Sequence, residues 1–475
     1  WEWCDHAIYK GKNAEGRDLY FYGGDHGEYP EDGNFCMDGL VYPDRTPHTG
    51  LLEYKNVHRP ARVCSYDQDT GILVLKNEMN FVDLKDYLDI FYEVSADGRV
   101  TAAGRVDEGS IPAIPPGKEA QLFLPVEVLE RGRGYLKICY TLKKADAFRR
   151  QGHMLGFDEI ALANQDPRNQ TGLMWQDESA VASQSLPQLK VSETPRQLMV
   201  EGGSFTYVYN KLYGVFDRLT EGGEEFLDRP MELNVWRAPT DNDMYIKAEW
   251  KKAMYDRAAS RAYVTDYTLT AKYLEIHSKM AMTAVTVQRM MDIDTVWHID
   301  NSGQISVRME VTRNPDFPVL PRFGLRLFLP GEMDQVTYFG LGPQESYVDK
   351  RRAASHGIFS SPVAGLHEDY LRPQENGSHH DCDYVVVSGA GRTMKAYGEK
   401  PFSFNASVYT QEELAKKKHN FELVPCSSTV WNLDFRQNGI GSNSCGPRLQ
   451  ERYRLAEESF TFSLHLKPEH VRKDT

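Results

Sequence analysis

Short alternations of hydrophobic and polar residues dominate the chain from about residue 61 onward. Four such runs are bounded by turn residues: 71–75, 88–94, 121–125 and 135–142. Residues 459–466 alternate with a period of two, which predicts a strand with one buried face. Further strands are predicted at 204–209, 284–287 and 305–311. The pattern therefore predicts a mainly β protein.

Helical spacing is confined to three places. Residues 50–57 carry hydrophobic positions at helical spacing and stop before Arg59 and Pro60, as a helix does ahead of proline. Residues 244–259 and 411–418 suggest two more helices. The aromatic, Gly/Asp-rich stretch at residues 1–39 predicts loop.

Changes in pattern divide the chain into successive parts. A β-sandwich of roughly 100 residues is predicted at 60–165. Residues 166–189 are rich in Pro, Ser and Gln and predict a linker. The remaining residues, 190–475, predict one large antiparallel sheet assembly.

Composition narrows the function classes. The chain has 475 residues, with 68 acidic against 55 basic side chains and a net charge of −13, which disfavours nucleic acid and anionic membranes as partners. It has no hydrophobic run of about 18 residues, so no membrane span is predicted. Seven cysteines without a C-x-x-C pair predict free thiols and a cytoplasmic location. Because the chain opens inside an aromatic run at Trp1, we expect it to be a piece of a longer protein, and an upstream signal peptide stays open.

Clusters of aromatic, amide and acidic residues in Gly-rich loops are typical of sugar sites. Glu2 lacks the second carboxylate that a glycosidase needs. Residues 378–383 (SHHDCD) lack the spacing of a metal site. The run 439–441 (GIG) does not have the pattern of a phosphate-binding loop, and no His and carboxylate can be tied to Cys445 as a nucleophile.

The strongest motifs match one family. Four motifs of the chain resemble the end of the catalytic barrel in large bacterial β-galactosidases of the lactose-operon type, glycoside hydrolase family two. They are residues 1–5 (WEWCD), 22–25 (YGGD), 35–41 (FCMDGLV) and 44–48 (DRTPH). Four further motifs resemble the C-terminal β-supersandwich of that family. They are residues 236–243 (WRAPTDND), 340–347 (GLGPQESY), 373–377 (PQENG) and 439–447 (GIGSNSCGP).

The resemblance implies a fold for each part of the chain. Residues 1–59 are expected to form the end of a (β/α)8 barrel, residues 60–165 an immunoglobulin-like β-sandwich, and residues 190–475 a large antiparallel β-supersandwich. In this family the two catalytic glutamates, an acid/base and a nucleophile, lie on earlier barrel strands. Neither therefore has a counterpart here, and Glu2 matches a position that is not catalytic.

The resemblance also implies substrate and cation roles. Trp1 matches a tryptophan that packs against galactose, at the strand end where barrel enzymes place their sites. Phe35 matches a phenylalanine whose carbonyl ligates a sodium ion and whose ring moves as substrate enters. Asp38 stands where members often have an asparagine ligand of that ion, and a carboxylate there adds charge. Cys445 stands where the best-studied members have a tryptophan that stacks on the aglycone sugar. Residues 244–250 align with a mobile loop that closes over the site.

We therefore expect the C-terminal part of a retaining β-galactosidase that acts on terminal β-D-galactose residues, with Na⁺ and Mg²⁺ as cofactors of the full enzyme. Alone, the chain is expected to be inactive; the missing N-terminal domains complete it, and the full-length enzyme is expected to be a homo-oligomer. Two alternatives stay open. A non-catalytic carbohydrate-binding module would carry its pocket on the sheet of residues 190–470, independent of Trp1. A small subunit of a split β-galactosidase would need a large subunit, but a start inside a barrel strand favours a partial sequence.

Overall fold

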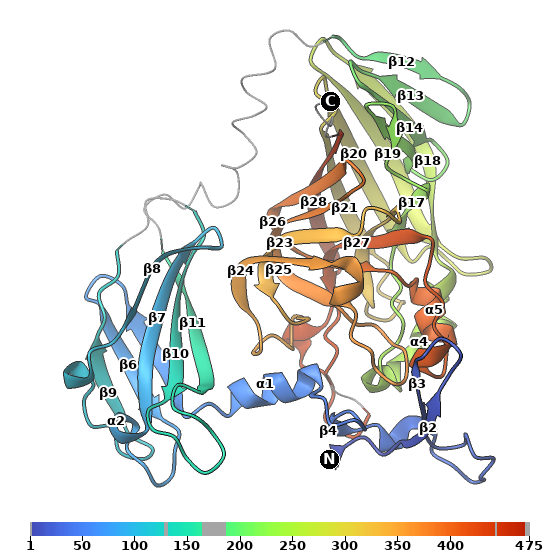
Figure 1. The fold of residues 1–475 in the computed structure, drawn as a ribbon. Coiled ribbons are helices and arrows are strands. Elements are labelled where there is room, and N and C mark those ends of the chain that lie inside the picture. The colour runs from blue at the N-terminus through green and yellow to red at the C-terminus, as the bar shows by residue number, and fades with distance from the viewer. Residues whose placement is uncertain (1, 128–131, 164–186, 442–443, 471–475) are drawn as a thin grey trace. The chain divides into compact units, whose positions relative to one another are not determined.

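The computed structural model describes residues 2–127, 132–163, 187–441 and 444–470 (Figure 1). These residues form two compact units, each described by itself. The larger unit takes in the described residues up to Arg45, those from Pro187 to Arg351, and those from Phe359 onward; the smaller takes in those from Thr46 to Ala163 with Arg352–Ile358. Most of the predicted linker at 166–189 lies outside the described residues, and the predicted domain boundaries stay predictions.

The smaller unit is the predicted β-sandwich. It opens with the predicted helix α1 (Thr49–Val57). Its first sheet contains β5 (Ala61–Asp67), β6 (Ile72–Asn77) and β9 (Glu119–Phe123), and its second contains β7 (Leu88–Ala96), β8 (Arg99–Arg105), β10 (Gly134–Leu142) and β11 (Met154–Leu162). Their inward-facing residues, among them Leu73, Leu122, Ile90 and Ile138, form one buried core, as alternating strands require. The short helix α2 (Leu84–Tyr87) leads into β7.

The larger unit is built on a 12-stranded antiparallel sheet, as predicted for a supersandwich. Its strands are β17 (Arg229–Asn234), β18 (Ala259–Leu269), β19 (Tyr273–Thr283), β20 (Met291–Asp300), β21 (Ile305–Arg313), β22 (Arg322–Pro330), β23 (Gln335–Gly342), β24 (Ser355–Pro362), β25 (Ser378–Gly389), β26 (Arg392–Ser407), β27 (Ser428–Gln437) and β28 (Ser459–His470). A second sheet contains β12 (Lys190–Glu193), β13 (Gln197–Glu201), β14 (Phe205–Asn210), β15 (Val215–Glu221) and β16 (Glu224–Glu225).

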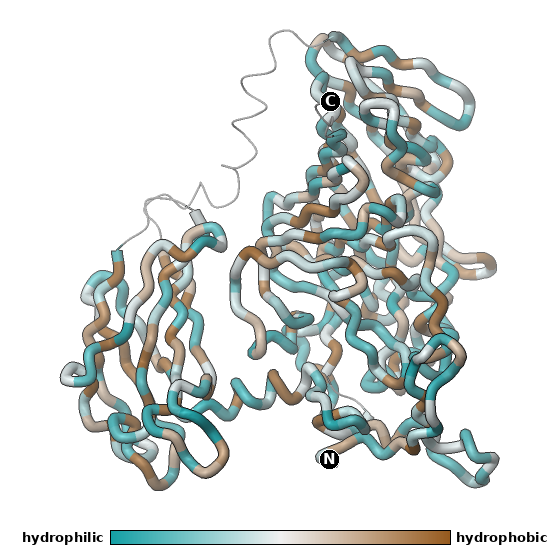
Figure 2. The backbone as a smooth tube through the Cα atoms, viewed as in Figure 1, coloured by the Kyte–Doolittle hydropathy of each residue, from teal (hydrophilic) through white to brown (hydrophobic). Residues whose placement is uncertain are grey.

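The two sheets of the larger unit share one hydrophobic core. Phe216 of β15 meets Trp297 of β20 edge to face, with ring centroids 5.0 Å apart. Hydrophobic and hydrophilic positions interleave along the strands (Figure 2), as expected for sheets that bury one face. None of the helices formed by the described residues is long and apolar enough to cross a membrane.

The loop predicted for residues 1–39 is wrong in part. Strand β1 (Glu2–Cys4) pairs in parallel with β4 (Gly39–Val41), and β2 (Ile8–Lys12) pairs with β3 (Asp18–Phe21). These strands have three to five residues, too few for a period of two to show in the sequence. Gly39 is needed at the parallel pair, because a Cβ there would lie 2.3 Å from the backbone nitrogen of Asp5.

Two other predictions need correction. Residues 284–287, predicted as a strand, form the turn between β19 and β20, where Thr286 has a φ of 73° and Val285 is 80% exposed. The β-branched composition misled the prediction, because Val285 and Thr286 are exposed and only Ala284 and Val287 pack against the core. The predicted helix at 244–259 is shorter: α4 (Ile246–Lys252) ends before Met254, whose φ of 60° breaks it. The helix predicted at 411–418 is α5 (Gln411–Lys416).

Candidate functional site

Asn34 ties the N-terminal segment to the loop that follows Trp236. It lies in the 3-10 helix η1 (Gly33–Cys36), and its Nδ2 donates to Asp241 Oδ1 at 2.6 Å. Its Oδ1 accepts from Arg372 Nη1 at 2.7 Å. Gln374 holds the same aspartate twice, donating to Asp241 Oδ2 at 2.9 Å and accepting from the Asp241 backbone at 3.1 Å. All four side chains are partly buried, so this network fixes the backbone next to Phe35.

Phe35 and Asp38 follow Asn34 directly in the chain. The Phe35 ring is 55% exposed, so it is available to a ligand. Asp38 Oδ1, in contrast, is buried and has no hydrogen-bond partner among the described residues. A buried oxygen without a donor is costly unless a cation or water meets it. This oxygen therefore fits a hard cation.

The loop at residues 240–243 is held rigidly from behind. Around η4 (Asp241–Asp243), the Thr240 backbone donates to Asp243 Oδ2 at 2.9 Å, and the Asp243 backbone donates to the Thr240 carbonyl at 3.0 Å. The buried Arg237 guanidinium donates to both carboxylate oxygens of Asp243, at 2.8 and 3.2 Å, and also to the carbonyl oxygens of Asn438 and Gly439. These bonds join the motif at 236–243 to the beginning of the motif at 439–447, and the side chain that makes them is fully buried.

The segment that carries Cys445 contacts the same loop. Asn242 donates to the Ile440 carbonyl at 3.0 Å, and Ser444 Oγ donates to Asn242 Oδ1 at 3.4 Å. Cys445 itself is exposed and has a free thiol. The structure thus places the Phe35 and Cys445 segments against one short loop.

The Gly-rich run at residues 439–441 binds a carboxylate of the chain. Asp349 Oδ1 accepts from the Ile440 backbone at 3.0 Å, and Oδ2 accepts from the Gly441 backbone at 2.7 Å. The amide groups that could hold an anionic ligand are therefore used internally, in line with the expectation that this run does not bind phosphate.

A buried ionic cluster supports the motif at residues 373–377. Arg322 donates to both oxygens of Asp434, at 3.0 and 2.5 Å, and lies 3.3 Å from Glu375. Burial raises the pKa of Glu375 above its ordinary value, and Arg322 opposes that shift. The Glu375 backbone donates to the Ala238 carbonyl at 3.1 Å, so this cluster also supports the loop that binds Asn34.

A second anchor between the N-terminal segment and the large sheet assembly involves Asp25. His419 Nε2 lies 2.7 Å from Asp25 Oδ2, and its Nδ1 lies 3.0 Å from Glu422 Oε1. The Tyr22 hydroxyl also donates to the Lys418 carbonyl. The motif at 22–25 is therefore structural in this chain.

The remaining sequence-based candidates have clear positions. Glu2 is partly exposed and lies 3.9 Å from His6, while Trp1 falls outside the described residues. Nδ1 of His379 lies 3.2 Å from the Leu341 carbonyl oxygen, and Nδ1 of His380 lies 3.0 Å from Ser403 Oγ. No group of three or more metal-ligating side chains occurs among the described residues. The roles of Trp1, Phe35, Asp38 and Cys445 stay predictions.

Sequence reasoning missed Asn34, Asp241, Arg372 and Gln374 as individual residues. All four lie in or directly beside quoted motifs, but their partners are far apart in sequence, so no spacing could pair them. The segment expected to close over the site is partly helical: Trp250 of α4 is buried and donates to the Val319 carbonyl at 2.8 Å.

Comparison with known proteins covers nearly the whole chain. The family model described as β-galactosidase small chain matches residues 201–466, that of the glycosyl hydrolases family 2 TIM barrel domain matches residues 1–63, and that of β-galactosidase domain 4 matches residues 73–163.

Curated relatives agree with these models. A β-galactosidase of Actinobacillus pleuropneumoniae is 40% identical over 98% of this chain and 44% of its own length, and one of Staphylococcus xylosus is 34% identical over 98% and 46%. The chain thus spans about half the length of the relatives it matches. A solved galactose 1-epimerase from Lactobacillus acidophilus covers 61% of this chain and all of its own at 9% identity and a TM-score of 0.34, too low to support an argument. The family predicted from the motifs is confirmed: this chain belongs to the β-galactosidases of glycosyl hydrolase family 2 and contains their small-chain region.

Proposed function

We propose that the chain is the C-terminal part of a retaining β-galactosidase that hydrolyses terminal β-D-galactose residues. One observation carries this proposal: Asn34, Asp241 and Arg372 join the barrel-like segment to the small-chain region next to the exposed Phe35. A substrate wall assembled from both parts is what the family resemblance predicts. The catalytic glutamates would come from earlier barrel strands, so the chain alone is proposed to be inactive.

The proposed contribution of this chain is to bind and orient the substrate. Trp1 would pack against the galactose ring, the exposed Phe35 ring would close one side of the pocket, and Cys445 would lie at the aglycone side. Tight positioning matters because a glycosidase gains much of its rate from holding the sugar in a reactive geometry. The anchors at Asn34 and Arg237 would serve that positioning.

Asp38 and the Phe35 carbonyl would hold the sodium ion. The buried, unpartnered Asp38 Oδ1 supports this role, because hard oxygen ligands suit such a cation. When bound, the ion would supply a local positive charge that polarises and orients a substrate hydroxyl. We propose Mg²⁺ as a second cofactor of the full enzyme, on the family resemblance alone.

The remaining proposals concern the whole protein. Its substrate would be a lactose-like β-galactoside, its location the cytoplasm, and its assembly a homo-oligomer. Each rests on the family to which the chain belongs.

The test is hydrolysis of a chromogenic β-galactoside by the chain alone, and by the chain mixed with an N-terminal fragment that carries the missing barrel. Activity only in the mixture is the expected result. Activity of the chain alone would contradict the proposed inactivity, and a properly assembled but inactive mixture would favour a carbohydrate-binding module.

The cation role has its own test in the active mixture. The Asp38→Ala variant is expected to lose the stimulation by sodium, whereas the exposed control Asp44→Ala keeps it. An unchanged sodium response in the Asp38→Ala mixture would remove Asp38 from the cation site.

A further inference from the structure

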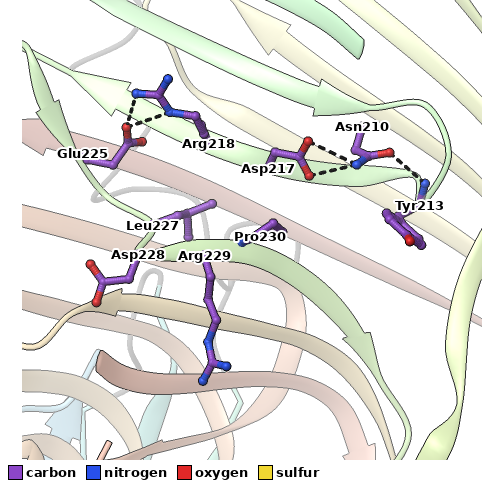
Figure 3. A pocket seen from close by; sticks show the side chains of 9 residues that line it. All are labelled: Asn210, Tyr213, Asp217, Arg218, Glu225, Leu227, Asp228, Arg229 and Pro230. Atoms are coloured by element: carbon purple, nitrogen blue, oxygen red, sulfur yellow. Dashed lines mark hydrogen bonds and ion pairs between the residues drawn. The ribbon is translucent and has the colours of Figure 1, made fainter. Parts of the chain in front are cut away.

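A cavity of about 590 Å³ opens in the larger unit between β15 and the beginning of β17 (Figure 3). It is lined by Asn210, Tyr213, Asp217, Arg218, Glu225, Leu227, Asp228, Arg229 and Pro230. None of these residues belongs to the N-terminal segment or to the network around Asn34. The hollow is open to solvent and not enclosed, and its volume is within the range of small-ligand sites.

Tyr213 gives this cavity an aromatic wall. It lies in the turn between β14 and β15 and is 46% exposed. Its backbone nitrogen donates to Asn210 Oδ1 at 3.2 Å, and its carbonyl accepts from Ser260 Oγ at 2.8 Å, so the turn is fixed. A half-exposed ring on a fixed turn can stack on the C–H face of a sugar with little loss of conformational freedom.

The polar groups of the cavity are held in place while still reaching solvent. Both oxygens of Asp217 accept from Asn210 Nδ2, at 3.0 and 3.1 Å, and Oδ2 also accepts from Gln197 Nε2 at 2.9 Å. Arg218 donates to Glu225 Oε2 through Nε at 3.0 Å and Nη2 at 2.6 Å (Figure 3), and among the described residues Nη1 has no hydrogen-bond partner. Carboxylates accept from sugar hydroxyls and a guanidinium donates to them.

The charges of the cavity decide between ligand classes. The lining contains three carboxylates, Asp217, Glu225 and Asp228, and two guanidinium groups, so an anion such as phosphate is disfavoured. One of those guanidinium groups, Arg229, already lies 3.6 Å from the centre of the Phe328 ring. Leu227, Pro230 and the Tyr213 ring give the lining its apolar surface, and the polar groups beside them would fix the orientation of a sugar.

We propose that this cavity is a second saccharide-binding site, which takes a neutral sugar by stacking on Tyr213 and hydrogen bonding to Asp217 and Arg218. It is separate from Phe35 and Asp38 and does not depend on the proposed hydrolytic function. The chain would thereby hold a glycan on the small-chain region in addition to any substrate at the barrel.

The experiment is hydrogen–deuterium exchange of the full chain with galactose, lactose or inorganic phosphate, combined with saturation-transfer NMR of the sugars. Protection of peptides that cover residues 210–230 by a sugar, and not by phosphate, is the expected result. No protection there by either sugar up to its solubility limit, or protection by phosphate alone, would overturn the proposal.

Variants localise the binding. Tyr213→Ala and Asp217→Asn are each expected to weaken sugar binding at least fivefold, whereas Tyr213→Phe keeps most of it. The control Tyr267→Ala removes a tyrosine of similar exposure from β18, outside the cavity, and should change nothing. Phe35→Ala should leave the protection at 210–230 intact, so failure at the barrel site is distinguishable from failure here. Equal affinity in Tyr213→Ala, with an unchanged unfolding temperature, would contradict the proposal.

Discussion

Asn34 and Asp241 share a hydrogen bond of 2.6 Å although 207 positions separate them in the chain. Asn34 donates to Asp241 and accepts from Arg372, so each end of its amide has a partner of the matching kind. This single side chain orders the backbone that carries Phe35, and it makes a charge-swap experiment possible.

Asn34→Asp places two carboxylates against each other and is expected to destabilise the contact by about 1–2 kcal/mol. The double variant Asn34→Asp with Asp241→Asn restores one donor and one acceptor, while Arg372 and Gln374 keep their partners. Faster hydrogen exchange at residues 33–36 in the single variant, reversed in the double variant, is the expected outcome. If both variants exchange alike, this pair does not order the Phe35 loop.

The sequence predicts the buried strands of this molecule better than its turns and the pairing of short strands that lie far apart in the chain. Strands such as β21 and β28 are visible because alternate side chains are buried for nine residues or more. The turn at Val285 has strand-like composition without burial, and β1 and β4 are stabilised by a pairing partner 37 positions away. Only local patterns are legible in a single sequence.

In the candidate site, too, short motifs can be predicted from the sequence and contacts between distant segments cannot. The motifs that contain Phe35, Asp38 and Cys445 can be found by resemblance, because each is a short run of residues. The bonds from Asn34 to Asp241 and from Asn242 to Ser444 cannot, because they depend on how distant loops fold against one another. Which residue a polar side chain hydrogen bonds to is decided by the fold and not by its neighbours in the sequence.

Glu345 is a buried carboxylate whose ionised form stabilises the fold. Burial alone would raise its pKa, but Lys350 at 2.7 Å, Tyr370 at 2.6 Å and the Gly377 backbone at 2.8 Å lower the pKa to about 2. An unfolded glutamate has a pKa near 4.5. This stabilisation is therefore fully present above pH ~4.5 and is lost as the pH falls toward 2.

Glu345→Gln tests this relation. The shift corresponds to roughly 3 kcal/mol, so the variant is expected to be less stable at neutral pH and to lose less stability between pH 4.5 and 2. Urea unfolding across that range measures both effects. Glu310→Gln, at an exposed pair with Arg308, is the control and should follow the unmodified chain. Parallel curves for Glu345→Gln and the unmodified chain would contradict the prediction.

His379 is the opposite case to Glu345, because the fold keeps its side chain neutral. Burial lowers its pKa from 6.5 to about 4, its Nε2 is buried without a partner among the described residues, and its ring stacks near Tyr338 and Phe404 at 4.4 and 5.2 Å. Below pH 6.5 the unfolded chain takes up a proton that the folded chain does not. Stability is therefore expected to fall between pH 6.5 and 4, by up to roughly 3 kcal/mol.

His379→Phe keeps an aromatic ring and removes the titration. The variant is expected to lose the part of the pH dependence that lies between 6.5 and 4, as measured by denaturant unfolding, while His277→Gln, at an exposed histidine, retains it. An unchanged slope in His379→Phe would mean that the unfolded and folded chains protonate this residue alike.

Cys445 offers a gain-of-function test of the proposed aglycone side. Its thiol is exposed, and its neighbour Ser444 contacts Asn242 of the loop that holds Asn34. Cys445→Trp would supply the flat ring that the family resemblance predicts at this position, and aromatic stacking of about 1 kcal/mol corresponds to roughly fivefold in affinity. In the reconstituted enzyme the KM for lactose is expected to fall by about that factor. Methyl β-galactoside, whose aglycone is too small to stack, should show no change, and neither should the control Cys64→Trp at an exposed thiol of the sandwich. A lower KM for both substrates would place the new ring against the galactose, and no change for lactose would separate residue 445 from the aglycone altogether.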